Sequence, residues 1–413
     1  MQPTDPSHDL FFARQPLDAL FAPRVVAVVG ATETAGAVGR TLLWNLLASP
    51  FGGTVYPVNP HRRSVLGVRA YPTLRDVPDA VDLAVIATPA DSVPQVVREC
   101  VGARVQAAVV ISAGFREVGE RGAALEAEVL KEAQKGSLRL LGPNSLGLMR
   151  PHRGLNATFA QAHPRPGSVA LLSQSGALVT AVLDWGAREN VGFSAVVSLG
   201  SMLDVGWGEA IDFLGNDPHT ESILLYMETL GDARRLLSAA REVALQKPIL
   251  VLKAGRDTRM TDAVASHTGA MVGTDAAVEA ALRRVGVLRV DTIAELFYTA
   301  ETLAKQPRPA GPRLTILSNA GGPALLAADA LLDGGGELAP LTETSTATLE
   351  ELLPPEGSAA NPVDLLHDAG PDRFEQALKT ADADPHSDGT LVVFSPQAGV
   401  DPAAVAERLR PHA

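Results

Sequence analysis

Apolar residues along the chain gather in short continuous runs, and most of these runs end in a turn rich in Gly, Ser or Pro. A run that is apolar throughout, without alternation, is typical of a parallel β-strand buried on both faces. Segments with helical spacing separate the runs, so the pattern predicts an α/β fold. The predicted strands begin at Arg24, Thr54, Asp82, Ala107 and Leu138, at Ser168, Phe193, Ser222 and Pro248, and at Arg313 and Thr390.

The predicted elements fall into three groups. Residues 1–148 and 149–304 each show the strand and helix alternation of a doubly wound parallel sheet, in which ligands bind at the carboxyl ends of the strands. A linker with three prolines, 305–313, leads to a third group at 312–413. The third group is short for such a domain, so we expect an incomplete domain and a chain that is a fragment or one subunit of a split enzyme.

Charge and cysteine content exclude several classes of protein. The 413 residues carry a formal net charge of −12, and nothing in the sequence offers the basic stripe that a nucleic acid needs. A single cysteine, Cys100, excludes a disulfide framework and a Cys-based zinc site, and no metal site is predicted. The N-terminal residues lack the features of a signal peptide, and no apolar run reaches the length of a membrane span. We expect a soluble, cytoplasmic protein.

The turn after the first strand contains Gly30, Gly36 and Gly39 and leads into a helix. Such a turn lets backbone amides approach a phosphate group closely, although a turn required only for packing is the alternative. The spacing differs from the G-x-G-x-x-G pattern of dinucleotide-binding folds.

The second strand ends in Asn59, where an NAD site normally has an acidic residue. The residues Arg62 and Arg63 follow, and two arginines suit a phosphorylated ribose, as in NADP or in the 3′-phosphate of coenzyme A. A solvated loop is the alternative interpretation of the two arginines. The strand before Asn59 favours this residue as a ligand contact.

Two further turns have the character of anion sites. A helix is predicted to begin near Gly176, where unpaired amides lie at the positive end of the helix dipole. A second turn, LGPNSLGL, faces the same edge of the predicted sheets. The candidate anion-binding residues are Ser175, Gly176, Ala177, Gly142, Pro143 and Asn144.

The ordered motifs GATETAGAVG, VYPVNP, VIATPAD, ISAGF, LGPNSLGL, SQSGAL, YMETLGD, LKAGR, SHTGAM, SNAGGPA and NPVDL cover nearly the whole chain. In this order they resemble the nucleoside-diphosphate-forming acyl-CoA synthetases, a family that includes ADP-forming acetyl-CoA synthetase and the α subunit of succinyl-CoA synthetase. The resemblance implies a Rossmann-like CoA-binding domain followed by two flavodoxin-like domains. It also implies CoA-binding residues at Gly30, Ala31, Thr32, Gly36, Val38, Gly39, Asn59, Pro60, Arg62, Arg63, Thr88 and Pro89.

A lone histidine such as His267, in VASHTGAMVG, is most often a surface or capping residue. The resemblance implies instead that His267 carries a phosphoryl group, and that Glu228 hydrogen-bonds the far ring nitrogen and stabilises the charged imidazole. The reaction would convert acyl-CoA, phosphate and ADP to a carboxylate, CoA and ATP through an acyl phosphate. Because no P-loop is present, Mg-ADP or Mg-ATP is expected on an ATP-grasp domain, either in a β-type partner subunit or in a C-terminal part, and the assembly is expected to be oligomeric.

Three other functions fit parts of the sequence. A serine hydrolase is disfavoured because SQSGA breaks the G-x-S-x-G pattern. An NADP-binding oxidoreductase is disfavoured by the missing dinucleotide spacing. A CoA-binding regulatory module of a synthetase-like protein acyltransferase remains an alternative, although the presence of His267 favours catalysis.

Overall fold

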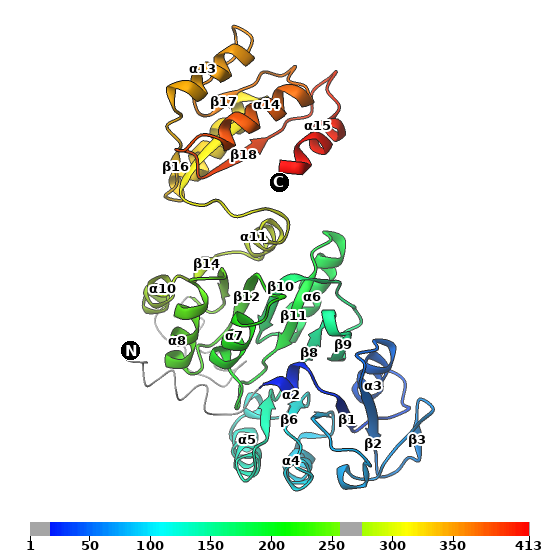
Figure 1. Cartoon of the computed structure of the whole chain (residues 1–413). Helices are drawn as coiled ribbons and strands as arrows, with labels where there is room; N and C mark the ends of the chain where they lie inside the picture. Colours follow the sequence, from blue (N-terminus) through cyan, green and yellow to red (C-terminus); the bar gives the residue numbers. More distant parts are fainter. Residues whose placement is uncertain (1–16, 257–274, 413) are drawn as a thin grey trace, which may run out of the picture. The chain divides into compact units, whose positions relative to one another are not determined.

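A computed structural model of the protein describes residues 17–256 and 275–412. The chain divides into two compact units, Met1–Ala304 and Lys305–Ala413 (Figure 1). Between α11 (Ile293–Lys305) and β15 (Arg313–Ser318), residues 306–312 contain no helix or strand, because prolines there prevent regular hydrogen bonding. The predicted linker contains this stretch.

Unit 1 begins with a five-stranded sheet, all of whose strand pairs are parallel, in the order β2-β1-β5-β6-β7. Side chains alternate between the two faces of β1, so Val26 and Val28 pack with α3, whereas Ala27 and Val29 join the core under α4 and α5. Helices therefore cover both faces, as predicted. The elements are β1 (Val25–Val29), α3 (Val38–Ala48), β2 (Thr54–Val58), β5 (Leu83–Ile86), α4 (Val93–Gly102), β6 (Ala107–Val110), α5 (Glu120–Ala133) and β7 (Arg139–Leu141); a short helix α2 (Asp18–Phe21) precedes them, and a small hairpin, β3 (Ser64–Val65) and β4 (Val68–Arg69), follows β2.

A seven-stranded sheet in the order β14-β13-β12-β10-β11-β8-β9 completes unit 1. Five of its strands are parallel, and β8 and β9 form an antiparallel hairpin at one edge. One face carries α7, α8 and α10, and the other carries α6 and α11. The elements are β8 (Gly147–Arg150), β9 (Leu155–Thr158), β10 (Pro166–Ser173), α6 (Gly176–Arg188), β11 (Phe193–Ser198), α7 (Trp207–Gly215), β12 (Ser222–Met227), α8 (Ala233–Val243), β13 (Ile249–Lys253), α10 (Asp275–Arg284) and β14 (Leu288–Val290).

The β8–β9 hairpin was not predicted from the sequence. Strand β8 begins at Gly147 and pairs with β11, so the second sheet starts inside the predicted first domain 1–148. The hairpin also packs on α3, and its residues Leu148, Leu155 and Ala157 belong to the same core as the apolar residues of α3. The two sheets of unit 1 therefore share a continuous hydrophobic core.

Unit 2 holds a parallel sheet in which β15 pairs with β16, β17 and β18. Helices α13, α14 and α15 pack on one face, and α12 packs on the other. The predicted α/β architecture therefore extends to this unit, whose further elements are α12 (Gly321–Asp333), β16 (Glu337–Leu338), α13 (Glu343–Leu352), β17 (Val363–Asp364), α14 (Pro371–Asp382), β18 (Gly389–Val393) and α15 (Pro402–Leu409). No described helix in either unit is long and apolar enough to cross a membrane.

Candidate functional site

A cavity of about 650 Å³ lies in unit 1, at the carboxyl ends of strands of both sheets. Its wall includes the turns after β5, β6 and β7 and the first turn of α6. This position agrees with the rule that ligands of doubly wound sheets bind beyond the carboxyl ends of the strands. Six residues that the sequence analysis selected line the cavity: Val38, Thr88, Pro89, Asn144, Gly176 and Ala177.

The glycine-rich turn after β1 is shaped by close contacts between backbone segments. Gly30 has φ +90°, and a Cβ at this residue would lie 2.8 Å from the Ala87 carbonyl oxygen. A Cβ at Gly39 would lie 2.1 Å from the Gly30 carbonyl oxygen, so only glycine lets α3 approach the turn. Packing alone thus explains Gly39, and its role in binding CoA stays a prediction. Gly36, at φ +77°, is exposed and has open space around it.

Asn59 holds the glycine-rich turn in place. Its Nδ2 donates to the Ala31 carbonyl oxygen at 2.7 Å, and its Oδ1 accepts from the His61 N–H at 2.8 Å. The side chain of Asn59 is therefore used mainly within the protein, where it links the end of β2 to the turn after β1. Thr32, in the same turn, accepts at its Oγ1 from the Thr34 N–H at 3.3 Å.

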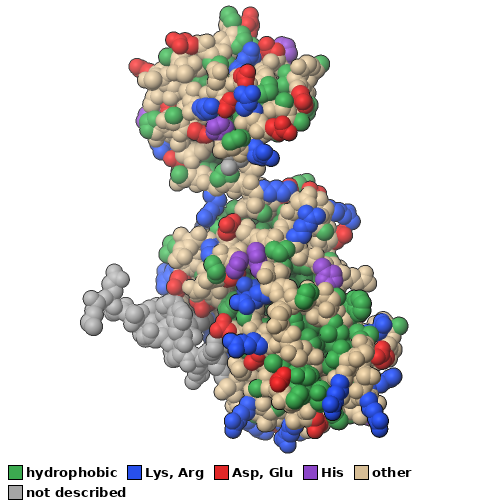
Figure 2. Space-filling view, turned by 45° about the vertical axis from the view of Figure 1, so that its right-hand side comes forward, with side chains coloured by type: hydrophobic (Ala, Val, Ile, Leu, Met, Phe, Trp, Pro, Cys, Tyr) green, Lys and Arg blue, Asp and Glu red, His purple; other side chains and the backbone are tan. Residues whose placement is uncertain are grey.

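The loop after β2 presents two cations to solvent. Pro60, Arg62 and Arg63 are exposed, and they are not part of the cavity wall. Within the described part of the chain, no carboxylate forms a salt bridge with either arginine. On the face of the molecule shown in Figure 2, apolar side chains gather in one area, and Lys and Arg side chains lie around it. Both guanidinium groups are thus available to an anionic ligand.

The turn 142–144 is anchored by its backbone. The carbonyl oxygens of Gly142 and Pro143 accept hydrogen bonds from the N–H groups of Leu203 and Ser201, at 3.0 and 2.9 Å. Gly142 and Pro143 are buried, whereas Asn144, at φ +54°, is exposed and lines the cavity. Of the three predicted residues, Asn144 is the one that faces the cavity.

The start of α6 has the geometry of an anion site. Ser175 is the N-cap, and its Oγ accepts from the Leu178 N–H at 3.3 Å. Among the described residues, none accepts a hydrogen bond from the N–H groups of Gly176 and Ala177, which belong to the cavity wall. These amides lie at the positive end of the helix dipole, so this part of the cavity favours a negatively charged group. The structure brings Asn144, Gly176 and Ala177 to one cavity, whereas Gly142, Pro143 and Ser175 are not part of its wall. The anion-binding role of these residues stays a prediction.

Glu228 follows β12 and lies next to the turn that precedes α6. The residue is only 8% exposed, and its N–H donates to Gln174 Oε1 at 2.7 Å. Burial raises the pKa of Tyr226, and the nearby charge of Glu228 raises this pKa further. His267 lies outside the described residues, so its contact with Glu228 stays a prediction.

The cavity wall also contains residues that the sequence analysis did not select. Ser112 and Ala113 come from the turn after β6, and Ser112 Oγ donates to the Thr88 carbonyl oxygen at 2.5 Å. These residues belong to the motif ISAGF, so a signal was available in the sequence. Phe159 and Thr180 also line the cavity, and no local pattern marks them as site residues.

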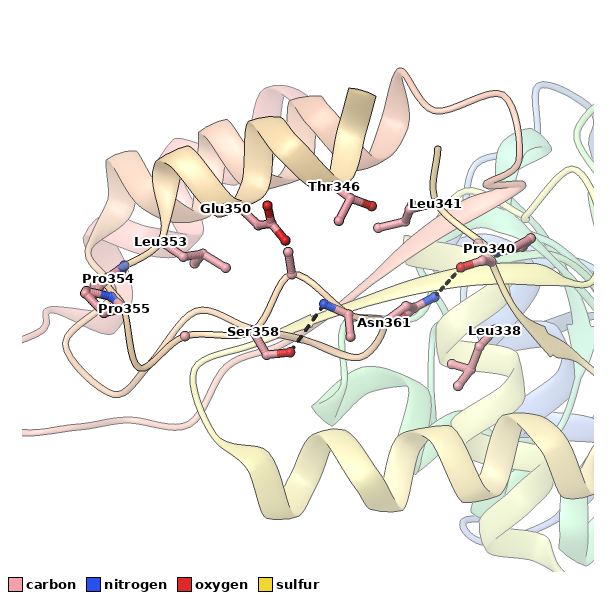
Figure 3. A pocket seen from close by; sticks show the side chains of 14 residues that line it. Leu338, Pro340, Leu341, Thr346, Glu350, Leu353, Pro354, Pro355, Ser358 and Asn361 are labelled. Carbon is pink, nitrogen blue, oxygen red and sulfur yellow. Dashed lines mark hydrogen bonds between the residues drawn. The ribbon is translucent and has the colours of Figure 1, made fainter. Parts of the chain in front are cut away.

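A second cavity, of about 920 Å³, lies in unit 2 beside α13 (Figure 3). Leu341, Leu353 and Pro354 give it an apolar wall, and the carboxylate of Glu350 points into it. Asn361, of the motif NPVDL, uses its amide to bind the backbone of Leu314, Ile316 and Ala339. Because no candidate site residue lines this cavity, the first cavity is the better candidate.

Comparison with family models assigns a class to each part of the chain. Residues 24–151 match the CoA binding domain, residues 166–303 the succinyl-CoA ligase like flavodoxin domain, and residues 314–410 the ligase-CoA domain. The three matches together define a chain of the CoA ligase class.

Individual relatives narrow this class. The chain is 43% identical over 391 residues to an ADP-forming acetate–CoA ligase I of Archaeoglobus fulgidus, an alignment that covers 95% of this chain and 56% of the relative. It is 40% identical over 401 residues to the α subunit of an ADP-forming acetate–CoA ligase I of Pyrococcus furiosus, covering 95% of this chain and 85% of that subunit. The chain belongs to the family of ADP-forming acetate–CoA ligases.

The fold of a solved relative agrees with this assignment. The dinucleotide-forming acetyl-coenzyme A synthetase 1 of Ca. Korarchaeum cryptofilum, solved with phosphate and ADP, has a TM-score of 0.91 and 37% sequence identity, over 96% of this chain and 85% of that one. The family resemblance and the predicted fold class, a Rossmann-like domain followed by flavodoxin-like ones, are confirmed. The chain spans little more than half the length of the Archaeoglobus relative.

Proposed function

We propose that the chain performs the CoA-dependent and phosphate-dependent steps of an ADP-forming acyl-CoA synthetase. The observation that carries this proposal is the shared cavity. Thr88 and Pro89, from the candidate CoA-binding turns, line the same cavity as Gly176 and Ala177, at the positive end of α6. A thioester and a phosphate ion bound there would lie close enough to react.

The proposed reaction has two steps. An oxygen of hydrogen phosphate attacks the thioester carbonyl carbon, the C–S bond breaks, and the sulfur takes up the phosphate proton, so that CoA leaves as its thiol and an acyl phosphate remains. A ring nitrogen of His267 then attacks the phosphorus, a P–N bond forms, and the carboxylate leaves. The amides of Gly176 and Ala177 would stabilise the negative charge on the phosphoryl oxygens. Glu228 would hold the protonated nitrogen of the imidazole.

The CoA site extends beyond the cavity in this proposal. The glycine-rich turn at 30–39 would hold the pyrophosphate, and Arg62 and Arg63 would bind the 3′-phosphate, because their guanidinium groups pair with no described carboxylate. The phosphoryl group of His267 would finally pass to ADP, bound with Mg²⁺ on an ATP-grasp domain in a β-type subunit or a C-terminal part. Because the sequence has a single cysteine, we place this activity in the reducing cytoplasm.

Mass spectrometry tests the proposal directly. The purified chain is incubated with acetyl-CoA and inorganic phosphate, and the peptide that contains His267 is examined for an acid-labile, base-stable phosphate. We expect phosphate on His267 in the wild type and none in His267→Ala, while both proteins bind CoA with similar affinity in calorimetry. Bound CoA without phosphate, over a panel of acyl-CoA substrates, would support a CoA-binding regulatory module instead. Loss of CoA binding in His267→Ala would show that His267 is structural.

A further inference from the structure

Gln174 connects the start of α6 to the residues that follow β12. It lies in the turn between β10 and α6, and its backbone N–H donates to the Tyr226 carbonyl oxygen at 3.2 Å. Its side-chain Oε1 accepts from the N–H groups of Glu228 and Thr229, at 2.7 and 2.8 Å. Its Nε2 donates to Thr229 Oγ1 at 2.8 Å. One side chain therefore makes three hydrogen bonds to two consecutive residues.

The hydrogen bonds of the Gln174 side chain satisfy backbone groups that lie beyond the end of the pairing between β10 and β12. The register between β10 and β12 ends at Ser173 and Tyr226, so no described strand pairs with Glu228 and Thr229 on this side. Both residues are buried, at 8% and 7% exposure, and a buried N–H without an acceptor is costly. The carboxamide of Gln174 supplies the acceptor.

Lys253 holds the same peptide segment from the opposite side. It is the last residue of β13, pairs in register with Met227 and is only 4% exposed. Its Nζ donates to the Glu228 carbonyl oxygen at 2.9 Å and to the carbonyl oxygen of Ala254. The N–H of Glu228 is thus held by Gln174 and its C=O by Lys253. The next residue is anchored as well, because Trp207 Nε1 donates to the Thr229 carbonyl oxygen at 3.0 Å.

We propose that Gln174 and Lys253 are positioning residues that fix the backbone of Glu228, and thereby its carboxylate, relative to the anion site at the start of α6. This inference rests on the proposed function, in which Glu228 orients His267. Gln174 stands two residues before Gly176, so the turn that presents amides to the cavity also carries the residue that holds Glu228. In this proposal the motif SQSGA, which is unsuited to a serine hydrolase, combines the residue that positions Glu228 with the amides of the anion site.

Hydrogen exchange tests whether Gln174 holds the backbone of Glu228 and Thr229, independently of any enzymatic activity. Gln174→Leu removes the acceptor from two buried N–H groups, and we expect the amides of Glu228 and Thr229 to exchange with solvent about tenfold faster or more, as loss of a hydrogen bond implies. Gln95→Leu is the matched control, because Gln95 is exposed on α4 and, among the described residues, its side chain bonds to Arg98 and Glu99 of its own helix. Unchanged exchange at Glu228 and Thr229 in Gln174→Leu would overturn the proposal.

The effect on chemistry is tested by the rate at which His267 acquires phosphate from acetyl-CoA and phosphate. We expect Gln174→Leu and Lys253→Met to lower this rate by about 10- to 100-fold, as is typical when a residue that orients a catalytic group is lost. CoA affinity should stay close to that of the wild type. A wild-type rate in Gln174→Leu would overturn the proposal, whereas absence of phosphate in the wild type itself would refute the proposed function and leave the exchange result to decide on the positioning of Glu228.

The pH profile of Gln174→Glu separates positioning from a merely structural role. The introduced carboxylate still accepts from both N–H groups, but it brings a negative charge to the backbone of Glu228 and has no proton for Thr229 Oγ1. Burial and the neighbouring charge raise the pKa of the introduced group above that of a free glutamate. We therefore expect the rate, relative to that of the wild type, to recover as the pH falls from 8 to 5. A constant ratio would contradict the proposal.

Discussion

At the residue scale, single contacts decide which side chain a position tolerates. Gly30 and Gly39 both approach other backbone segments so closely that a methyl group does not fit. Gly67, by contrast, has φ +77°, and no atom lies within 4 Å of the place a Cβ would occupy, so it is a glycine for conformational reasons alone. The two kinds of glycine look alike in the sequence, yet they have different physical causes.

We expect Gly39→Ala to lower the free energy of unfolding of unit 1 by about 3 kcal/mol, at the upper end of overpacking effects. The added methyl group would lie 2.1 Å from the Gly30 carbonyl oxygen, and α3 has to move away from the turn to relieve the clash. Gly67→Ala should cost only about 1 kcal/mol, for its left-handed backbone. Urea unfolding followed by Trp fluorescence measures both, and equal losses would refute the steric explanation.

At the scale of elements, α3 and the β8–β9 hairpin join the two sheets of unit 1. Asn45, on the buried face of α3, donates from Nδ2 to the carbonyl oxygens of Thr158 and Ala160, each at 2.8 Å. These carbonyl groups lie at the end of β9 and just beyond it, and β9 is the edge strand of the sheet among the strands that the structure describes. One polar side chain therefore closes the edge of the second sheet against a helix of the first.

Asn45→Leu should destabilise unit 1 by about 2–4 kcal/mol, because two carbonyl groups in a buried setting lose their donor. Asn216→Leu is the control, since Asn216 is exposed at the end of α7 and, in the part of the chain that the structure describes, its side chain donates to the Asp212 carbonyl oxygen of its own helix. Urea denaturation with Trp fluorescence compares the two variants. If both lose the same small amount of stability, the link between α3 and β9 contributes little.

The same hairpin shows how far the fold could be predicted from the sequence. The inner strand β1 is apolar throughout, and β11 is apolar apart from Ser194 and Ser198, so their apolar runs predicted both strands directly. Strands β8 and β9 contain Arg150, Asn156 and Thr158, which are buried and yet polar. Arg150 is paired with Asp217 at 3.0 Å, 67 residues away, and no local pattern reveals such a distant partner.

The candidate site likewise contains residues that the sequence predicted and residues that it did not. Turns between a strand and a helix were predicted because glycines and small polar residues follow apolar runs, and Thr88, Asn144 and Gly176 do meet in one cavity. The roles of Gln174 and Lys253 could not be predicted, because both residues bind mainly backbone groups of Glu228 and Thr229, which follow β12. Sequence patterns identify side chains, whereas contacts to a distant backbone emerge only from the fold.

At the scale of the whole molecule, the stability of each unit can be measured separately. All three Trp and all four Tyr residues precede residue 305, so their fluorescence reports on unit 1 alone. In unit 2, the pKa values of two aspartates, Asp384 and Asp388, lie well below that of a free aspartate. Hydrogen bonds from Arg313 lower the pKa of Asp388 to about 2. Burial by itself raises the pKa of Asp384, but hydrogen bonds from Ser345, Thr342 and His386 outweigh burial and lower it to about 2.

These shifts predict that unit 2 loses stability in acid. A carboxyl group whose pKa is lower in the folded than in the unfolded protein stabilises the fold above its unfolded pKa of about 3.9, and this contribution is lost as the pH falls toward 2. For Asp384, which is 2% exposed, the contribution at pH 7 is about 2 kcal/mol. Hydrogen exchange of peptides from 313–412, measured over a urea series, should show lower stability at pH 3 than at pH 7.

Asp384→Asn isolates the contribution of this carboxylate. The Asp384 oxygens accept from Thr342 N–H, Thr342 Oγ1 and His386 N–H, each at 2.8 Å, and an amide cannot accept all three hydrogen bonds. We expect the variant to be about 2 kcal/mol less stable than the wild type at pH 7. The difference should be smaller at pH 3, because the stabilising contribution of the Asp384 carboxylate decreases as the pH falls. Asp333→Asn removes the same charge from an exposed site at the end of α12 and should change stability little at either pH. If Asp333→Asn reproduced the pH dependence of Asp384→Asn, net charge rather than the hydrogen bonds of Asp384 would account for the response of unit 2 to acid.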